Sequence, residues 1–144
     1  MRLQKATQCA LFAVLELANK PDKQLSATDI AEKYGISANH LAKVLRDLGR
    51  AGLVESVRGA GGGYRFCGNT KRTTLYDLVQ LFEDVGAELR EGRAESDHTE
   101  VGQGLGRILS EIDEIAIATL RSITIATFLK SMHWHAERQS RGVA

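Results

Sequence analysis

The residues with the clearest chemical purpose lie in the short stretch VESVRGAGGGYRF, residues 54–66. Arg58 and a run of glycines separate two apolar segments, which predicts a β-hairpin with a glycine-rich tip. Glycine permits positive φ angles and a close approach of the backbone to another surface. An arginine at such a tip could enter a narrow, electronegative groove of a nucleic acid. Two other interpretations stay open, an ordinary surface hairpin and a phosphate-binding loop, although the stretch lacks the P-loop lysine and does not open a helix.

Thiols are the next candidates for chemistry. Cys9 and Cys67 are too few for a disulfide framework and are not spaced as a metal-binding CxxC. Cys67 follows the hairpin directly, so its oxidation could shift the hairpin if the thiol is exposed and its pKa is lowered. A buried, inert thiol is the alternative for Cys67, and packing is expected for Cys9. No GxSxG, HExxH or nucleophile–base–acid pattern is present, so we predict that the chain is not an enzyme.

Acidic residues and histidines form two further groups. Glu95, Asp97, His98 and Glu100 could together offer oxygen and imidazole ligands to a metal, although a solvated acidic loop is the interpretation that we favour. The histidines of HWH, residues 133–135, point in well-separated directions in either a strand or a helix, so they make no ready chelate. We therefore predict no metal site and a frayed C-terminal tail.

The elements that position these residues begin with three helices. Apolar residues at helical spacing predict a helix over residues 6–20. Ser26 can cap a second helix that ends at Gly35, and Ser37 can cap a third helix over residues 38–52. Two helices joined by the tripeptide GIS are typical of a helix-turn-helix.

The hairpin over residues 53–66 follows the third helix at once, and a further helix over 75–85, capped by Thr74, comes next. A helix-turn-helix followed by a two-stranded hairpin is the order of a winged-helix DNA-binding domain. In that arrangement the second helix of the motif enters the major groove and the wing lies along the backbone or the minor groove.

The segments MRL, DIAEKYGISANHLAKVLRDLGRAGLVESVRGAGGGYRF and TTLYDLVQLFE together resemble the IscR/NsrR-type family of bacterial winged-helix transcriptional regulators. The likeness covers roughly residues 1–85. It implies a mainly α fold with a small β-hairpin, composed of a winged helix-turn-helix domain and a long C-terminal dimerisation helix. It also implies a homodimeric transcription factor, usually a repressor, that responds to a redox, metal or small-molecule signal.

The chain departs from this family in the loop over residues 86–104. Members that carry an iron–sulfur cluster place three closely spaced cysteines there, because thiolates are the usual ligands of such clusters. This loop contains no cysteine, and Gln8 stands where some relatives carry an additional carboxylate ligand. We therefore expect no iron–sulfur cluster and no other cofactor. The signal could then act on Cys67, on the group around His98, or in a small-molecule pocket near the dimerisation helix.

The predicted helices and the resemblance together select thirteen positions for DNA contact. These are Arg2, Lys5, Ser26, Thr28, Ser37, Ala38, Asn39, His40, Lys43, Ser56, Arg58, Gly59 and Tyr64. Asn39 could pair with adenine, and Lys43 with guanine or phosphate. Ala42 stands where cytosine-reading relatives carry an acidic residue, so specificity at that base should differ. For His40 and Tyr64, packing within the domain is an equally strong interpretation.

A second apolar row predicts a helix over residues 105–130, followed by a tail over 131–144. Its stripe consists of Leu105, Ile108, Ile112, Ile115, Thr119 and Ile123. An apolar face this long on a small domain needs a partner, unless it folds back on its own domain. Two-fold pairing would place two recognition helices about one DNA turn apart, which implies a near-palindromic operator on double-stranded DNA.

Composition agrees with a DNA-binding part followed by an oligomerisation element. The 144 residues are 43% hydrophobic, enough for one domain with an added oligomerisation element. Residues 1–85 hold twelve Lys and Arg against nine Asp and Glu, whereas residues 86–125 hold four against eight. The basic part suits a polyanion. No secretory signal or membrane-spanning run is evident, so we expect a cytoplasmic protein. A winged-helix module that binds another protein, without specific DNA binding, is the alternative function.

Overall fold

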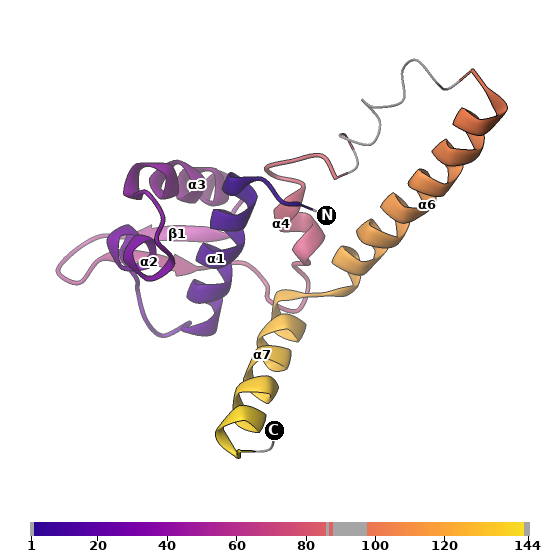
Figure 1. Cartoon of the computed structure of the whole chain (residues 1–144). Coiled ribbons are helices and arrows are strands. Elements are labelled where there is room, and N and C mark those ends of the chain that lie inside the picture. The colour runs from indigo at the N-terminus through magenta and orange to yellow at the C-terminus, as the bar shows by residue number, and fades with distance from the viewer. Residues whose placement is uncertain (1, 86, 88–97, 143–144) are drawn as a thin grey trace.

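Helices make up most of the structure, and one β-hairpin projects from it (Figure 1). The computed structural model describes residues 2–85, 87 and 98–142. The elements in chain order are α1 (Lys5–Asn19), α2 (Ala27–Tyr34), α3 (Ala38–Arg50), β1 (Val54–Val57), β2 (Gly63–Phe66), α4 (Leu75–Val79), α6 (Glu100–Ser122) and α7 (Ile125–Ser140). The predicted fold class, mainly α with a winged helix-turn-helix, is confirmed.

Hydrogen bonds at the helix caps determine where the two helices of the helix-turn-helix begin and end. The Ser26 hydroxyl accepts a hydrogen bond from the Asp29 N–H at 3.0 Å, and the Asp29 carboxylate accepts one from the Ser26 N–H at 3.2 Å. Gly35 then ends α2 with a φ of 62°, a left-handed conformation that favours glycine. The Ser37 hydroxyl accepts from the His40 N–H at 3.4 Å and starts α3. These local bonds fix the turn between the two helices, as the sequence predicts.

Helix α1 lies in the centre of the N-terminal body. Ala10, Ala13, Val14 and Leu17 are fully buried on it. Its alanines let α3 and α4 pack closely against it, since small side chains permit a short distance between helix axes. Ile125, the first residue of α7, is also fully buried in this core.

The hairpin is tied to the body along its second strand. β1 and β2 are antiparallel, with Val54 opposite Phe66. The Tyr64 N–H donates to the Leu25 carbonyl at 2.8 Å, and the Leu25 N–H donates to the Tyr64 carbonyl at 3.1 Å. A Cβ atom on Gly63 would lie 2.5 Å from the Leu25 carbonyl oxygen, so this close approach requires glycine. The base of the wing is therefore held by the segment that precedes α2.

The helix predicted over 75–85 is shorter than expected. Helix α4 ends at Val79, and the chain continues in turns in which the Phe82 N–H donates to the Val79 carbonyl at 3.1 Å. Phe82 packs against the core, and Glu83 turns back to the start of α1, where its carboxylate accepts a hydrogen bond from the Gln4 N–H at 2.8 Å. These tertiary contacts end the helix, which periodicity alone would have continued.

The single helix predicted over 105–130 is wrong, because the chain breaks at Ile123 and Thr124. The Ile123 carbonyl accepts from the Leu75 N–H at 2.9 Å, and the Ile125 N–H donates to the Thr73 carbonyl at 3.0 Å. Thr124 then caps α7 by accepting from its third residue. This backbone pairing holds Ile123 in an extended conformation, so Ile123 does not continue the α6 stripe. We call this pairing of residues 73–75 with 123–125 the hinge.

The tail predicted over 131–144 is helical as far as Ser140, so that prediction is also wrong. Helix α7 packs on α1, with Leu129 against the core and His133 Nε2 lying 2.8 Å from Asn19 Oδ1. The body predicted to end at residue 85 is therefore completed by the first turns of α7.

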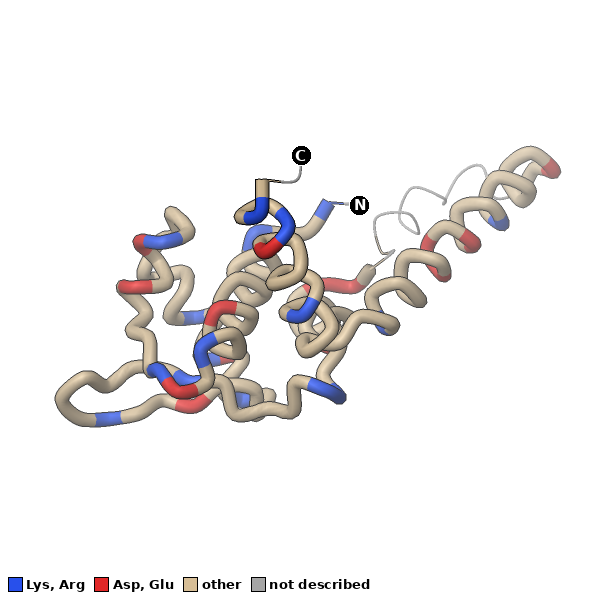
Figure 2. Tube along the Cα trace, turned by 90° about the horizontal axis from the view of Figure 1, so that it is seen from below, with Lys and Arg blue, Asp and Glu red and all other residues tan. Residues whose placement is uncertain are grey.

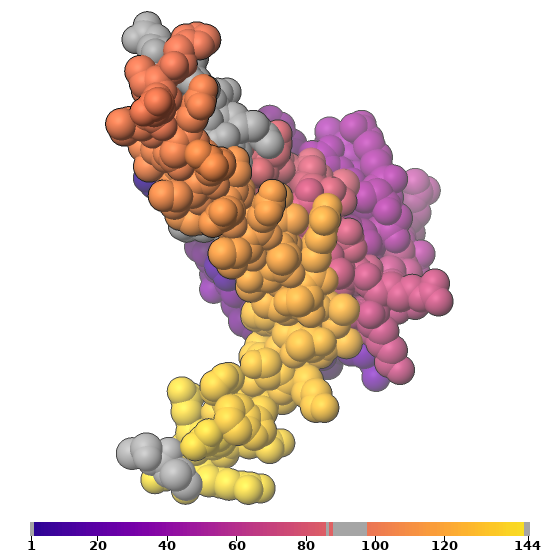
Figure 3. Space-filling model, turned by 90° about the vertical axis from the view of Figure 1, so that its right-hand side faces the viewer, coloured from indigo at the N-terminus to yellow at the C-terminus, as the bar shows by residue number. Residues whose placement is uncertain are grey.

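Helix α6 extends from the hinge away from the body (Figure 1). Among its residues only Gly102 is buried. In Figure 3, α6 in orange and α7 in yellow form one side of the molecule, and their outer ends project beyond the body.

Candidate nucleic-acid interface

Helix α3 has two opposed faces. Leu41, Val44, Leu45 and Leu48 are at most 2% exposed and face the core. The exposed face carries Asn39, Lys43, Arg46 and Arg50, again at spacings of three and four residues. A polar and basic face on the second helix of a helix-turn-helix is suited to the major groove.

Arg46 and Arg50 were not among the predicted contact residues. They share the exposed face with Lys43. Their spacing of three and seven residues from Lys43 indicates this shared face in the sequence alone. Arg50 lies 3.8 Å from the Asp47 carboxylate, whereas Arg46 forms no ion pair with the residues that the structure describes. Arg46 therefore extends the basic face of α3 by one helical turn.

Four predicted positions lie at the starts of α2 and α3. Ser26 and Ser37 are N-caps, so their hydroxyl oxygens already accept backbone hydrogen bonds within the protein. Thr28 and Ala38 lie in the first turns and are exposed. Helix N-termini attract phosphate because their first N–H groups are free and the helix dipole is positive there.

His40 and Tyr64 are both partly buried, in keeping with the packing interpretation. Tyr64 packs against the core, and its backbone pairs with Leu25 as described above. Nε2 of His40 is buried and has no hydrogen-bond partner among the residues that the structure describes. Ser56, opposite Tyr64 in the hairpin, is exposed.

The wing places Arg58 in solvent. The residue directly follows β1, is exposed, and forms no ion pair within the described part of the chain. Gly59 and Gly61 have φ angles of 115° and 77°, which favour glycine, and the Gly62 N–H closes the loop on the Gly59 carbonyl at 2.8 Å. Gly62 instead needs its small size, because a Cβ atom would lie 2.5 Å from the Val57 carbonyl oxygen. Figure 2 shows the resulting loop extending from the body with a basic residue on it.

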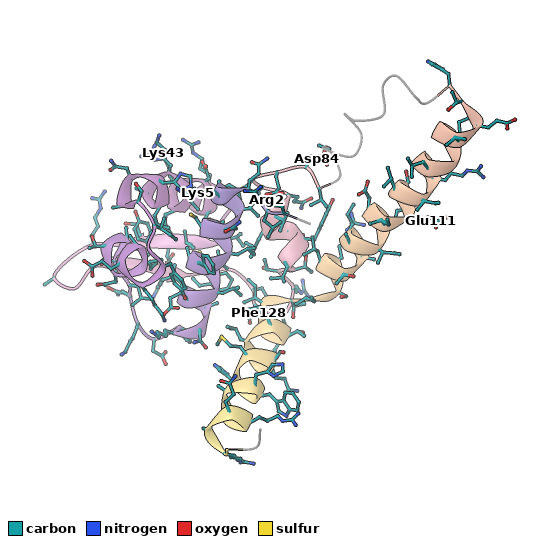
Figure 4. All side chains as sticks on the ribbon, viewed as in Figure 1. Arg2, Lys5, Lys43, Asp84, Glu111 and Phe128 are labelled. Carbon is teal, nitrogen blue, oxygen red and sulfur yellow. The ribbon has the colours of Figure 1, made fainter. Side chains whose placement is uncertain are left out.

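Arg2 and Lys5 lie at the start of α1, on the same side of the body as Lys43 (Figure 4). Both are exposed. Glu83 fixes this end of the chain, since its carboxylate accepts from the Gln4 N–H at 2.8 Å and from the hydroxyl of the buried Thr7. The three cations are thus held along one edge by α1 and α3.

A buried carboxylate ties α1 to the helix-turn-helix. Glu16 accepts hydrogen bonds from Lys20 at 2.9 Å, from Lys33 at 2.8 Å and from the Tyr34 hydroxyl. Burial alone would raise the pKa of Glu16, but the bonds from Lys33, Tyr34 and Lys20 outweigh it and lower the pKa to about 2. Burial and the hydrogen bond to Glu16 raise the pKa of Tyr34. The Tyr34 ring also stacks on Phe12, with 4.7 Å between ring centroids.

The predicted stripe on α6 is exposed. Leu105, Ile108, Ile112 and Ile115 each leave more than half of their surface in solvent. Val101, which the prediction omitted, is 81% exposed and continues the same row. Apolar surface of this extent on one helix marks an interaction site.

Comparison with known proteins decides the family. The sequence pattern of the Rrf2 family, described as iron-dependent transcriptional regulators, matches residues 3–131. The chain belongs to the Rrf2 family.

Relatives within and near the family agree. This Rrf2 chain is 58% identical over 142 residues to BadM, an HTH-type transcriptional regulator of Rhodopseudomonas palustris, a match that spans 99% of this chain and 90% of BadM. Among solved structures it resembles IscR of T. potens, with 26% identity, a TM-score of 0.68 and coverage of 92% and 88% of the two chains. It also resembles CymR, the global cysteine regulator of B. subtilis, with 25% identity, a TM-score of 0.69 and coverage of 91% and 98%.

The function class follows from this membership. The protein is a DNA-binding transcriptional regulator of bacterial type and not an enzyme, as the sequence predicts. Over residues 2–85, 87 and 98–142, we find no helix whose length and apolar character suit a membrane span.

The family description raises the question of iron, and the thiols of this Rrf2 protein do not fit a cluster. Cys9 is buried on α1, and burial raises the pKa of its thiol. Cys67 is exposed, which contradicts the buried interpretation, and its thiol donates to the Gly52 carbonyl at 3.3 Å. Partial desolvation and Glu55 raise the pKa of Cys67, and Arg65 offsets only part of this. Two thiols on separate elements, both with raised pKa, do not make a thiolate ligand set for a cluster.

Only part of the acidic group in the loop lies within the residues that the structure describes. Glu95 and Asp97 lie outside the described residues, whereas His98 and Glu100 are exposed. In the described part of the chain no three His, Cys, Asp or Glu residues lie together as metal ligands.

Proposed function

We propose that this Rrf2 protein is a homodimeric repressor that binds a near-palindromic operator on double-stranded DNA in the cytoplasm. The observation that carries the proposal is the exposed apolar row of α6, because a helix with no buried side chain of its own needs a second surface. A two-fold dimer would present two copies of α3 and of the wing to successive turns of DNA.

Within each half-site, α3 would read bases and the other elements would hold the backbone. Asn39 would pair with adenine, and Lys43 with guanine or phosphate. Arg58 would enter the minor groove beside the wing, with Gly59 permitting the close approach. The remaining predicted residues would contact phosphate or sugar. These are Arg2, Lys5, Ser26, Thr28, Ser37, Ala38 and Ser56, together with His40 and Tyr64 where packing leaves their edges accessible.

We further propose that the protein regulates without an iron–sulfur cluster. The support is the donor set, since the chain has only two cysteines and neither lies in the loop over 86–104. A redox, metal or small-molecule signal would then act elsewhere. Anaerobically purified protein should be colourless and contain far less than one iron per chain. Stoichiometric iron with visible absorption would overturn this proposal.

DNA binding is tested by selecting bound sequences from a random duplex pool with the full chain, followed by titration. We expect a two-fold symmetric consensus with salt-dependent affinity. Arg58→Ala should weaken binding about tenfold, the order expected when one arginine contact is lost. Arg141→Ala, which removes an exposed arginine near the end of α7, is the matched control and should leave binding unchanged. No enriched sequence, together with specific capture of a protein partner, would contradict the proposal.

A further inference from the structure

Two side chains hold the segment that precedes α1. Gln8 Nε2 donates a hydrogen bond to the Leu3 carbonyl at 2.9 Å, and the Glu83 carboxylate accepts one from the Gln4 N–H at 2.8 Å. The Leu3 carbonyl and the Gln4 N–H belong to the same peptide group, which we call the clamped peptide. The ends of a chain are poorly ordered unless such bonds tie them down. Here both polar groups of one peptide are bound, so its orientation is fixed.

Glu83 also supplies the cap that α1 lacks. Gln4 is the N-cap of α1, yet its own side chain makes no cap bond, and no acidic residue lies in the first turn. The Glu83 oxygen that accepts from the Gln4 N–H, Oε2, accepts a second hydrogen bond from the hydroxyl of Thr7, which is fully buried. A carboxylate from another part of the chain therefore takes the place of a local cap, at the helix end where a negative charge is favourable.

The body fixes the position of Glu83 itself. The Glu83 N–H donates to the carbonyl of Val79 at 3.1 Å, and Val79 is fully buried. The preceding residue, Phe82, packs against the core. The side chain of Glu83 then joins two residues that are 79 positions apart in the sequence. The clamped peptide is thus anchored to the core and not only to its own helix.

Two cations lie on either side of the clamped peptide. Arg2 precedes it directly, and Lys5 is the first residue of α1. Both are exposed and form no ion pair within the described part of the chain. Figure 4 shows them on the side of the body that carries Lys43. Holding the peptide fixes where both side chains leave the backbone, while their charged groups stay available to an anion.

We propose that Glu83 and Gln8 are positioning residues for DNA binding, which act by holding the clamped peptide. Arg2 and Lys5 then meet the phosphate backbone in an ordered geometry, and less chain entropy is lost on binding. The proposal deepens the DNA-binding function proposed above and rests on it. Glu83 and Gln8 themselves contact no DNA, and their effect passes through the two cations.

The sign of the effect separates positioning from simple electrostatics at Glu83. A negative charge near a DNA-binding edge repels phosphate, so its removal should by itself strengthen DNA binding. Positioning predicts the opposite result when the hydrogen-bond acceptor is removed. Glu83→Ala and Glu83→Gln have the same net charge, but only glutamine keeps an oxygen that can accept the two hydrogen bonds. Comparison of the two variants therefore isolates the hydrogen bonds from the charge.

The test is a titration of the full chain against a duplex that carries the consensus selected from the random pool. Glu83→Ala should weaken binding about tenfold, whereas Glu83→Gln should stay within about threefold of the unmodified chain. The slope of log K against log salt should fall in magnitude by about one to two for Glu83→Ala, because the phosphate contacts of Arg2 and Lys5 are lost. Circular dichroism at the assay temperature checks that the variants are folded.

A mutant cycle tests whether Glu83 acts through the two cations. The background is the double variant Arg2→Ala with Lys5→Ala. Adding Glu83→Ala to this background should change the affinity for DNA by less than about twofold, since the groups that Glu83 positions are already gone. A further tenfold loss would mean that Glu83 acts on another part of the interface, and it would overturn the proposal.

Gln8→Met tests the other side of the clamped peptide. Gln8 is exposed, and methionine is uncharged and of similar length but cannot donate to the Leu3 carbonyl. We expect DNA binding to be about threefold weaker. Gln139→Met, at an exposed glutamine of α7, is the matched control and should bind as the unmodified chain does. Unchanged binding by Gln8→Met overturns the proposal even where Glu83→Ala does not fold.

The outcomes distinguish the positioning role from the function on which it rests. Unchanged binding by Glu83→Ala, or an equal loss in Glu83→Ala and Glu83→Gln, overturns the positioning role and leaves the DNA-binding function in place. An unmodified chain that selects no duplex from the pool overturns the proposed function, and the positioning role fails with it.

Discussion

Helices α3 and α6 carry similar apolar rows, yet only α3 covers its row within the chain. The row on α3 is at most 2% exposed, whereas Leu105, Ile108, Ile112 and Ile115 of α6 are each more than half exposed. Periodicity therefore shows that a face will be covered, but not what covers it. In the body the same pattern stabilises the monomer. On α6 it is available for association.

The largest expected difference between α3 and α6 is the loss of unfolding free energy when a buried side chain of α3 is truncated. Leu48 on α3 is fully buried. Leu48→Ala should lower the free energy of unfolding by about 2–5 kcal/mol, since it removes apolar contacts and leaves a cavity. Urea denaturation followed by circular dichroism measures this. A loss below about 1 kcal/mol would mean that the core closes around the gap and that the body is less tightly packed than described.

An intermediate effect comes from acid. Because the folded pKa of Glu16 is lowered to about 2, its ionised form stabilises the body above the unfolded pKa of about 4.5. That contribution, about 3 kcal/mol, is lost as the pH falls from about 4.5 towards about 2. Glu16→Gln should therefore be less stable than the unmodified chain near neutral pH, and the difference should shrink near pH ~3. A difference independent of pH would contradict the network as the cause.

The smallest effect on the monomer is the matching truncation on α6. Ile112→Ala should change the free energy of unfolding by less than about 0.5 kcal/mol at concentrations where the chain is monomeric, because little buried contact is lost. The same change should weaken the dimer, as sedimentation would show. If the monomer were destabilised as strongly as by Leu48→Ala, α6 would have to pack on its own body, and the contrast between the helices would disappear.

The elements whose signals are local could be predicted well from the sequence. Ser26 and Ser37 begin their helices as expected, because a cap depends on residues within one turn. The apolar row of α6 could also be predicted from the spacing of its residues. Spacing also indicates that the basic face of α3 continues to Arg46, although the predicted contact residues on this helix end at Lys43.

What the sequence did not reveal depends on contacts between distant residues. The break at Ile123 and Thr124 lies in a run whose apolar spacing continues, and it arises because the backbone pairs with residues 73–75. Gly63 likewise owes its identity to Leu25, far from it in the chain. The exposure of Cys67 depends on how the end of β2 lies against Gly52. Such constraints are tertiary and leave no periodic trace.

The hinge also makes α6 a lever. The helix is about 34 Å long, so a rotation of only about 10° at the hinge moves its far end by about 6 Å. Threonines line this junction, since Thr74 forms the β-bridge with Thr124 and the Thr73 carbonyl accepts from the Ile125 N–H. The hydroxyls of Thr124 and Thr127 are hydrogen-bonded to each other. In the proposed two-fold dimer the rotations of the two α6 helices would add. A small change in these few backbone hydrogen bonds would then alter the distance between the two copies of α3.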